Sequence, residues 1–420
     1  MNITIKPSGG VGGEVRAPSS KAQTHRALFG ALLARGSTTI IHPLECDDTK
    51  ATERAITALG ARLSGSTVLS VSCDGTLNQP TGILDCGESG VTMRFVIPIL
   101  GLLGDSASVT ANESLIRRPI EPLADALKQL NVSLRIGERV VTVSGGPADG
   151  GTVSVRGNVS SQFISGLLFA GVMMKRGIRL EIISQLESRN YVLLTIEALR
   201  RHGVDINVSR DLSLFEIPRG QQLKPAIHEI SGDYSSASYH MCAAAITRSS
   251  LTVSNLSQKL EPDSFIVDLL SRMGVRTIAN KDSVIVEGGR LNANDVDIRE
   301  CPDLGPILAV LACYARGTTR ITGARRLRYK ESDRLASMRA ELISLGGKVE
   351  ETEDGLALKG PIDLSGGVVQ AHNDHRIAMA LSIAALRAKD DVTIQGAECV
   401  KKSYPTFFED LRSIGVKLVG

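Results

Sequence analysis

The most charge-dense stretch of the chain, residues 325–334, reads RRLRYKESDR. Five of its ten residues are basic, and Glu331 and Asp333 lie toward its C-terminal end. Because carboxylates are stabilised near the positive N-terminus of a helix, the pattern predicts a loop that runs into a helix. Basic groups can bind an anion and carboxylates can move a proton. The stretch therefore predicts a site for an anionic ligand that also needs acid–base chemistry.

Other polar loops bring similar residue types to predicted helix starts. The candidates are Lys21 and Arg26 in SSKAQTHR, Gly90 and Arg94 in GESGVTMR, Arg117 and Arg118 before Pro119, Ser160, Ser161 and Gln162 in SSQF, Asp303 in CPDLGP, His375 and Arg376 in NDHR, and Lys401 and Lys402. Each loop alone is equally typical of helix capping or of a solvated charge pair. It is the recurrence of these types in equivalent loops that favours a shared site.

Several kinds of chemistry lack a matching motif. His372 and His375 are three residues apart, but no Cys or Glu lies at a spacing that completes a zinc site. The chain has no GxSxG, no GxxxxGK[ST] and no GxGxxG after a predicted strand. We therefore expect no metal and no cofactor.

The bulk composition is that of an ordinary globular protein. The 420 residues are 42% hydrophobic and 22% charged, with a net charge of +3, which predicts two or three domains and no overall field for nucleic acid or membrane. Seven scattered cysteines without a CxxC pair indicate a reducing compartment. The first residues resemble no signal peptide, and no apolar run is long enough to span a membrane. We expect a cytoplasmic protein, and a monomer.

One unit of sequence recurs six times: an amphipathic helix, a Gly or Asn, and two short strands joined by a turn. The residue that ends each helix is suited to a left-handed C-cap. These residues are Gly60, Asn131, Gly203, Gly274, Gly346 and Gly415. Between the copies lie a further strand, a polar loop, an apolar helix, another strand and a second polar loop. The second loops fall at 44–50, 113–119, 186–191, 260–264, 325–334 and 399–405.

The last copy stops after one strand, and the N-terminal NITIKPSG resembles the strand that it lacks. Copies four to six would then close with the N-terminus. This predicts two lobes of three units each, residues 1–18 with 229–420 and residues 19–228. The alternative is a solenoid with one continuous core. Helix N-termini from several units could point at one cleft between the lobes, a suitable place for an anion.

The ordered motifs SSKxxxxR, GxSGxTMR, RRPI, SSQF, GDxSSASY, RxKESDR, NDHR and KSYP resemble those of the 5-enolpyruvylshikimate-3-phosphate (EPSP) synthases over essentially the full chain. The resemblance implies a mixed α/β (α+β) fold of two similar lobes, each of three βαβαββ units, that close on substrate. It implies transfer of the enolpyruvyl group of phosphoenolpyruvate to the 5-hydroxyl of shikimate 3-phosphate, on the route to chorismate and aromatic amino acids.

The resemblance also implies binding residues for both substrates. Those for shikimate 3-phosphate are Lys21, Arg26, Ser160, Ser161, Gln162, Ser188, Tyr191, Asp303 and Lys330. Those for phosphoenolpyruvate are Lys21, Gly90, Arg118, Gln162, Arg334, Arg376 and Lys402. Arg326 and His375 are further possibilities.

The reaction needs one acid–base pair that acts twice, because C3 of phosphoenolpyruvate is protonated when the hydroxyl adds and deprotonated when phosphate leaves. The resemblance implies that Asp303 and Glu331 are these carboxylates. Our hypothesis is that Glu331, assisted by Lys21, handles the C3 proton while Asp303 serves the hydroxyl.

Three residues depart from the family pattern. Ala22 replaces the usual Ser and Val91 a common Thr, while Arg326 stands where a polar residue such as Asn is frequent. The charge of Arg326 could replace the lost serine donor or could point away.

Three rival functions remain open at this point. The sister enzyme on UDP-N-acetylglucosamine is disfavoured, because residues 104–118 contain no Cys and residue 22 is not Asn. A binding protein with RRLRYK as a patch for nucleic acid or a partner would have no use for Asp303 and Glu331. A non-catalytic anion-binding homologue is the third alternative.

Overall fold

The computed structural model describes residues 1–257 and 261–420. Leu260, with which the predicted loop at 260–264 begins, lies outside the described residues. The chain divides into two compact units: unit 1 consists of Met1–Pro18 with Ser231–Gly420, and unit 2 of Ser19–Ile230. Each unit buries its own hydrophobic core. Two separate cores rule out the solenoid alternative.

In the part of the chain that the structure describes, the strands of unit 2 form three four-stranded sheets, ordered β14-β3-β5-β4, β6-β7-β9-β8 and β10-β11-β13-β12. The strands are β3 (Gly36–Ile41), β4 (Arg62–Ser64), β5 (Val68–Cys73), β6 (Leu84–Asp85), β7 (Ala107–Thr110), β8 (Val132–Ile136), β9 (Val140–Gly145), β10 (Gly151–Val155), β11 (Ile178–Ile182), β12 (Asn207–Val208), β13 (Leu214–Ile217) and β14 (Ile227–Glu229). The helices are α1 (Lys21–Leu33), α2 (Asp47–Ala58), α3 (Gly90–Leu100), α4 (Glu113–Ile116), α5 (Glu121–Lys128), α6 (Ser161–Met173) and α7 (Arg189–Arg201).

The described strands of unit 1 also form three four-stranded sheets, ordered β16-β17-β15-β2, β18-β19-β21-β20 and β22-β23-β1-β24. The strands are β1 (Asn2–Ile5), β2 (Glu14–Arg16), β15 (Ser250–Ser254), β16 (Arg276–Ala279), β17 (Ser283–Glu287), β18 (Val296–Asp297), β19 (Gly317–Thr322), β20 (Val349–Thr352), β21 (Gly355–Gly360), β22 (Gly367–Gln370), β23 (Val392–Gln395) and β24 (Leu418–Val419). The α-helices are α8 (Tyr234–Thr247), α9 (Phe265–Arg272), α10 (Gly305–Tyr314), α11 (Arg334–Ser344), α12 (His375–Ala385) and α13 (Phe407–Ser413). Short 3-10 helices are η1 (Pro262–Ser264), η2 (Pro302–Leu304), η3 (Arg325–Tyr329) and η4 (Ala397–Lys402).

The sheets repeat one pattern, which confirms the sixfold repeat. In each, one edge strand pairs in parallel with its neighbour, and that neighbour and the other two strands pair antiparallel in turn, as in β10, β11, β13 and β12. The predicted helix-ending residues all adopt the left-handed conformation that a C-cap requires. Their φ angles are 113° at Gly60, 60° at Asn131, 79° at Gly203, 93° at Gly274, 86° at Gly346 and 98° at Gly415.

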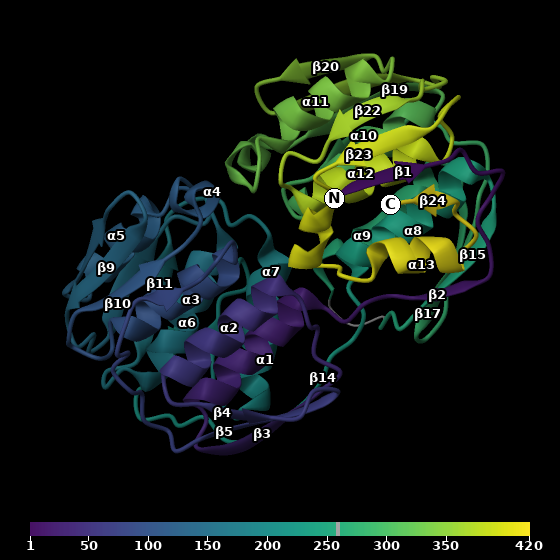
Figure 1. The fold of residues 1–420 in the computed structure, drawn as a ribbon. Coiled ribbons are helices and arrows are strands. Elements are labelled where there is room, and N and C mark those ends of the chain that lie inside the picture. The colour runs from purple at the N-terminus through teal and green to yellow at the C-terminus, as the bar shows by residue number, and fades with distance from the viewer. Residues whose placement is uncertain (258–260) are drawn as a thin grey trace. The chain divides into compact units, whose positions relative to one another are not determined.

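The N-terminal strand completes the last repeat as predicted. Strand β1 pairs antiparallel with β23 on one side and β24 on the other, and Figure 1 shows it in purple among the yellow strands. The partners of two other strands, one beside each crossing between the units, were not predicted from the sequence. Strand β2 joins β15 in unit 1, while β14 joins β3 in unit 2. The two chain segments that cross between the units are thus each anchored in a sheet next to the crossing.

Three apolar helices, α1, α3 and α6, come from equivalent places in the three repeats of unit 2 and pack in its core. Phe29, Phe95 and Phe169 meet there with ring centroids 5.3–6.2 Å apart. A Cβ on Gly166 of α6 would lie 2.4 Å from the carbonyl oxygen of Arg94, so only glycine allows α3 to approach this closely. In unit 1, α8, α10 and α12 are buried along almost their full length.

The polar loops that precede these helices carry most of the candidate residues. None of the helices found in residues 1–257 and 261–420 is long and apolar enough to cross a membrane.

Candidate functional site: an ion network and a set of helix starts

The start of α1 places Lys21 beside a carboxylate. Ser20 caps the helix by accepting the N–H of Gln23, and Lys21 is the first helical residue. Lys21 Nζ lies 2.7 Å from Oδ2 of Asp48, in the first turn of α2, and both side chains are largely buried. Asp48 was not among the predicted residues. The sequence feature that could have indicated it is the pair Asp47-Asp48 in the polar loop predicted at 44–50, which the structure places in the first turn of α2.

Arg26 is nearly fully buried and ties α1 to α7. Its Nε donates to Oγ1 of Thr195 at 2.8 Å and its Nη2 to the carbonyl of Tyr191 at 2.8 Å. The guanidinium also stacks near the rings of Phe95 and Tyr191. The structure therefore shows a cross-helix link for Arg26, whereas its contact with shikimate 3-phosphate stays a prediction.

The start of α3 gathers positive groups. Ser89 caps the helix by accepting the N–H of Thr92, and Gly90 is the first helical residue. A Cβ on Gly90 would lie 3.4 Å from Nη1 of Arg94 and 3.5 Å from Nη1 of Arg118. The backbone N–H groups of a helix start and two guanidiniums thus lie together, which suits a small anion. Arg94 was noted in the GESGVTMR motif but not proposed as a binding residue.

The starts of α6 and α7 carry the remaining unit 2 candidates. Ser160 caps α6 and accepts the N–H of Gln162, whose Oε1 lies 2.7 Å from Nη1 of Arg94. This bond joins the SSQF motif to the start of α3. Ser188 precedes α7 in the left-handed conformation, and Tyr191 follows in the first turn.

Unit 1 holds a buried ion network around Asp303, which lies in η2 just before α10. Its Oδ1 lies 3.2 Å from Lys330 Nζ and 2.9 Å from Arg334 Nη1, and its Oδ2 lies 3.0 Å from Arg376 Nη2. Three cations from two loops, residues 325–334 and 372–376, therefore converge on one carboxylate. We call Asp303, Lys330, Glu331, Arg334, Asp374 and Arg376 the ion network.

Arg334, the first residue of α11, is 1% exposed and bridges three carboxylates. It lies 2.6 Å from Oε2 of Glu331 and 2.8 Å from Oδ2 of Asp374, in addition to its bond with Asp303. Its contact with phosphoenolpyruvate stays a prediction. Asp374, which caps α12, is fully buried and was missed in the sequence, although it stands in the NDHR motif.

The charges in this network shift one another's protonation. Burial opposes ionisation of Asp303, but Arg376, Lys330 and Arg334 outweigh it and hold the pKa of its carboxyl well below the usual range. Burial lowers the pKa of Lys330. Asp263, another unpredicted residue, has its pKa raised to about 7 by burial and then by the Asp303 carboxylate. Asp303 is thus ionised, and a carboxyl that holds its proton near neutral pH lies close by.

The remaining unit 1 candidates differ in their surroundings. Arg376 donates to Oγ of Ser235, which lies in the first turn of α8 and was missed as a positioning partner. Lys402 in η4 donates to the carbonyl of Asn373. Nη2 of Arg326 donates to the carbonyl of Arg299 at 2.6 Å. His375 is buried at the start of α12.

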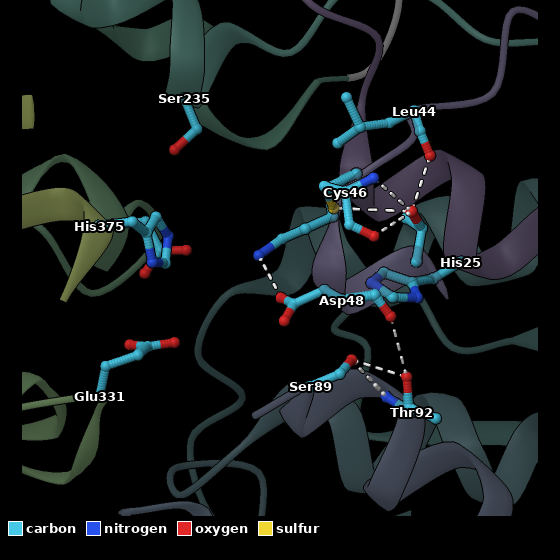
Figure 2. Close-up of polar contacts among 12 residues, drawn as sticks. His25, Leu44, Cys46, Asp48, Ser89, Thr92, Ser235, Glu331 and His375 are labelled. Carbon is cyan, nitrogen blue, oxygen red and sulfur yellow. Dashed lines mark hydrogen bonds and ion pairs between the residues drawn. The ribbon is translucent and has the colours of Figure 1, made fainter. Parts of the chain in front are cut away.

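In each unit the predicted residues lie at or near helix starts. Figure 2 draws Glu331 and His375 from unit 1 and, from unit 2, the unpredicted neighbours Asp48, Ser89 and Thr92. Among the described residues, no group of three or more His, Cys, Asp or Glu side chains is placed to hold a metal ion.

Comparison with known proteins places the chain in a family. Residues 5–411 match the family model described as EPSP synthase (3-phosphoshikimate 1-carboxyvinyltransferase). The chain belongs to the EPSP synthase family. The 3-phosphoshikimate 1-carboxyvinyltransferase of Methanocorpusculum labreanum is 38% identical over 415 residues, which is 97% of both chains. That of Halobacterium salinarum (strain R1) is 39% identical over the full length of both.

The fold agrees with this assignment. A solved EPSP synthase from Acinetobacter baumannii superposes with a TM-score of 0.83 at 26% identity, over all of both chains. The predicted family, the mixed α/β fold of two lobes and the enzyme class are therefore confirmed. The protein is an EPSP synthase-type enolpyruvyl transferase, which moves the enolpyruvyl group of phosphoenolpyruvate to shikimate 3-phosphate.

Proposed function

We propose that the two units divide this reaction between them, with proton transfer in unit 1 and most of the anion and hydroxyl recognition in unit 2. The residues of both units would then act on the same two substrates. The two units would be the predicted domains, residues 1–18 with 229–420 and residues 19–228. The observation that carries the proposal is the contrast in residue types. The predicted acid–base carboxylates lie in unit 1, whereas the starts of α1, α3 and α6 in unit 2 present cations, hydroxyls, an amide and backbone N–H groups.

In unit 2 the start of α3 would receive the phosphate or carboxylate of phosphoenolpyruvate. The guanidiniums of Arg94 and Arg118, which lie within 3.4–3.5 Å of where a Cβ on Gly90 would be, support this, because guanidiniums bind such groups bidentately. Lys21 would contact both substrates. Gln162, bonded to Arg94, would lie between them. The hydroxyls of Ser160, Ser161, Ser188 and Tyr191, with Arg26, would hold shikimate 3-phosphate.

In unit 1 Asp303 would take the proton of the 5-hydroxyl as this oxygen attacks C2 of phosphoenolpyruvate. Its lowered pKa keeps the carboxyl ionised at neutral pH, so that it is available to accept a proton, at the cost of weaker basicity. Glu331, with Lys21, would deliver a proton to C3 and remove one when phosphate leaves. Lys330 would contact shikimate 3-phosphate, and Arg334, Arg376 and Lys402 would stabilise phosphoenolpyruvate and the departing phosphate.

The test is phosphate release from shikimate 3-phosphate and phosphoenolpyruvate by wild type, Glu331→Gln and Asp303→Asn. Each variant should bind both substrates but turn over at least about 10²-fold more slowly, the usual scale for loss of an acid–base group. Turnover within a few-fold of wild type would remove that residue from the proton transfers. A wild type without phosphate release, in which both substrates still bind, would favour a non-catalytic homologue.

We also propose that the enzyme works in the cytoplasm, as a monomer, without a metal, a cofactor or a nucleic-acid partner. Activity should persist in a chelator, and the active species should elute at the mass of one chain in size-exclusion chromatography. Loss of activity in the chelator, or an active dimer, would contradict the respective part.

A further inference from the structure

A line of side-chain hydrogen bonds crosses three helices of unit 2. Nδ1 of His25 in α1 lies 2.8 Å from Oγ1 of Thr52 in α2, and this hydroxyl lies 2.6 Å from Oγ1 of Thr92 in α3. The Thr92 hydroxyl in turn donates to Oγ of Ser89 at 2.6 Å. We call His25, Thr52, Thr92 and Ser89 the hydroxyl chain. None of its four members is among the residues to which a substrate contact is assigned above.

The hydrogen bonds of the hydroxyl chain have one consistent direction. Because the Thr92 hydroxyl donates to Ser89, it must accept from Thr52, whose own proton is thereby used. Thr52 then accepts from His25, so Nδ1 of His25 carries the proton. Nε2 of His25 is left as a buried lone pair, and it has no hydrogen-bond partner among the described residues.

The hydroxyl chain is buried and uncharged. His25, Thr52, Thr92 and Ser89 are each 0% exposed. Burial, followed by the charges of Lys21 and Arg26, lowers the pKa of His25 well below its usual value. The imidazole is therefore neutral at physiological pH and serves as a fixed hydrogen-bond donor.

The bonds of the hydroxyl chain reach the helix starts at which ligands are proposed to bind. Ser89 caps α3 and immediately precedes Gly90. The Thr92 hydroxyl, whose proton goes to Ser89, also contacts the backbone oxygen of Asp48 at 3.5 Å, and Figure 2 shows this contact. The carboxylate of Asp48 in turn holds Lys21. A shift of Thr52 would therefore move the start of α3 relative to Lys21.

We propose that the hydroxyl chain is a positioning device, in which His25 and Thr52 hold the start of α3 against α1 and α2 and thereby set the affinity for phosphoenolpyruvate. The inference rests on the proposed binding of phosphoenolpyruvate at Gly90. Thr52 and His25 are positioning residues, because they act through Thr92 and Ser89 and not on the substrate.

The test is the KM for phosphoenolpyruvate in Thr52→Val, Thr52→Ser and Thr57→Val. Valine has the shape of threonine but lacks its hydroxyl, so it interrupts the hydroxyl chain in the middle, whereas serine keeps the hydroxyl. We expect Thr52→Val to raise this KM about fivefold, the scale of one lost hydrogen bond, with kcat within about twofold of wild type. Thr52→Ser should restore the wild-type KM.

The control Thr57→Val removes a hydroxyl of the same helix that, within the described part of the chain, donates to the carbonyl of Glu53. It should leave both constants unchanged. A merely structural role for Thr52 predicts a lower melting temperature with an unchanged KM, and that result would overturn the proposal.

A second pair of variants tests the donor-to-acceptor direction of the hydrogen bonds in the hydroxyl chain. His25→Asn keeps an N–H donor near the position of Nδ1, and His25→Leu removes it. We expect the asparagine variant to retain the wild-type KM and the pH profile of kcat, and the leucine variant to raise the KM as Thr52→Val does. Loss of turnover in His25→Asn, or a changed pH profile, would show that His25 takes part in proton transfer and would overturn the proposal.

Gly90→Ala separates this proposal from the one on which it rests. If Gly90→Ala raises the KM for phosphoenolpyruvate and Thr52→Val does not, the positioning role is wrong while the binding site stands. If neither variant changes the KM, the placement of phosphoenolpyruvate at α3 is itself wrong.

Discussion

In unit 1 a buried ion network holds the helix starts together, whereas in unit 2 the ion pair between Lys21 and Asp48 stands beside a chain of neutral hydrogen bonds. The ion network joins the starts of α11 and α12 to the loop before α10 through Arg334, Asp374 and Asp303. The hydroxyl chain joins α1, α2 and α3 through His25, Thr52 and Thr92. Both arrangements are built on the same repeat, so the difference lies in the side chains and not in the fold.

The difference has consequences for stability. Removing one member of a buried ion pair leaves an uncompensated charge, which costs far more than the net contribution of a neutral hydrogen bond. A proton-transfer site needs ionisable groups despite that risk. Positioning alone needs only fixed neutral donors and acceptors. We therefore expect the largest effects of substitution in unit 1.

Arg334→Met should show the largest effect on stability. It leaves Asp303, Glu331 and Asp374 without their shared cation in a buried place. We expect the free energy of unfolding in urea to fall by about 3–5 kcal/mol. Arg334→Lys keeps the charge but lacks the planar fork, so it should fall between the methionine variant and wild type. Equal stability of Arg334→Met and wild type would show that the network contributes nothing to the fold.

A histidine pair gives unit 2 its own pH dependence. His202 Nδ1 donates to the carbonyl of Lys224, so its Nε2 accepts the Nε2–H of His228 at 3.0 Å. Burial, followed by His202 and Arg201, lowers the pKa of His228 to about 3. In the unfolded chain this pKa is about 6.5, so the unfolded chain takes up a proton below that pH while the folded chain does not.

Stability should therefore be fully present above pH 6.5 and should decline toward pH 3. From pH 7 to pH 5 the loss from His228 is on the order of 2 kcal/mol, measured by urea unfolding. His228→Gln retains a donor to His202 but does not titrate, so its stability should change less over this range. An equally steep decline in this variant would assign the pH dependence to other groups.

Gly90→Ala should change substrate binding but not the free energy of unfolding. The added Cβ would make ordinary contacts with Arg94 and Arg118, so the fold tolerates it. The methyl group would nevertheless occupy space beside both guanidiniums, where an anion is proposed to bind. We expect the KM for phosphoenolpyruvate to rise roughly tenfold, or ~1.4 kcal/mol, with the free energy of unfolding unchanged. An unchanged KM would contradict anion binding at this helix start.

The fold was largely predictable because its local rules repeat. A Gly or Asn at each helix end predicted a left-handed C-cap, and all six of these residues have a positive φ angle. The truncated last copy identified β1 as its missing strand. The pairing of β2 with β15 and of β14 with β3 was not predictable, because strands this short have too few residues for their sequence pattern to indicate a partner strand.

The candidate site was predictable in its residue types but not in its pairings. The motifs contain Asp303, Glu331 and Arg334, yet nothing in their spacing shows that Arg334 bridges Asp303 and Asp374. Likewise His25 stands in a recognised motif, but its partner Thr52 lies in an unremarkable helix. Such contacts join residues far apart in sequence and depend on tertiary packing.

The most direct test of this division of labour compares Asp303→Asn with Thr52→Val in one phosphate-release assay. The account predicts that Asp303→Asn lowers kcat at least about 10²-fold with a nearly unchanged KM for phosphoenolpyruvate. It predicts that Thr52→Val raises this KM about fivefold with kcat nearly unchanged. The opposite pattern, a lowered kcat in Thr52→Val with normal turnover in Asp303→Asn, would contradict it.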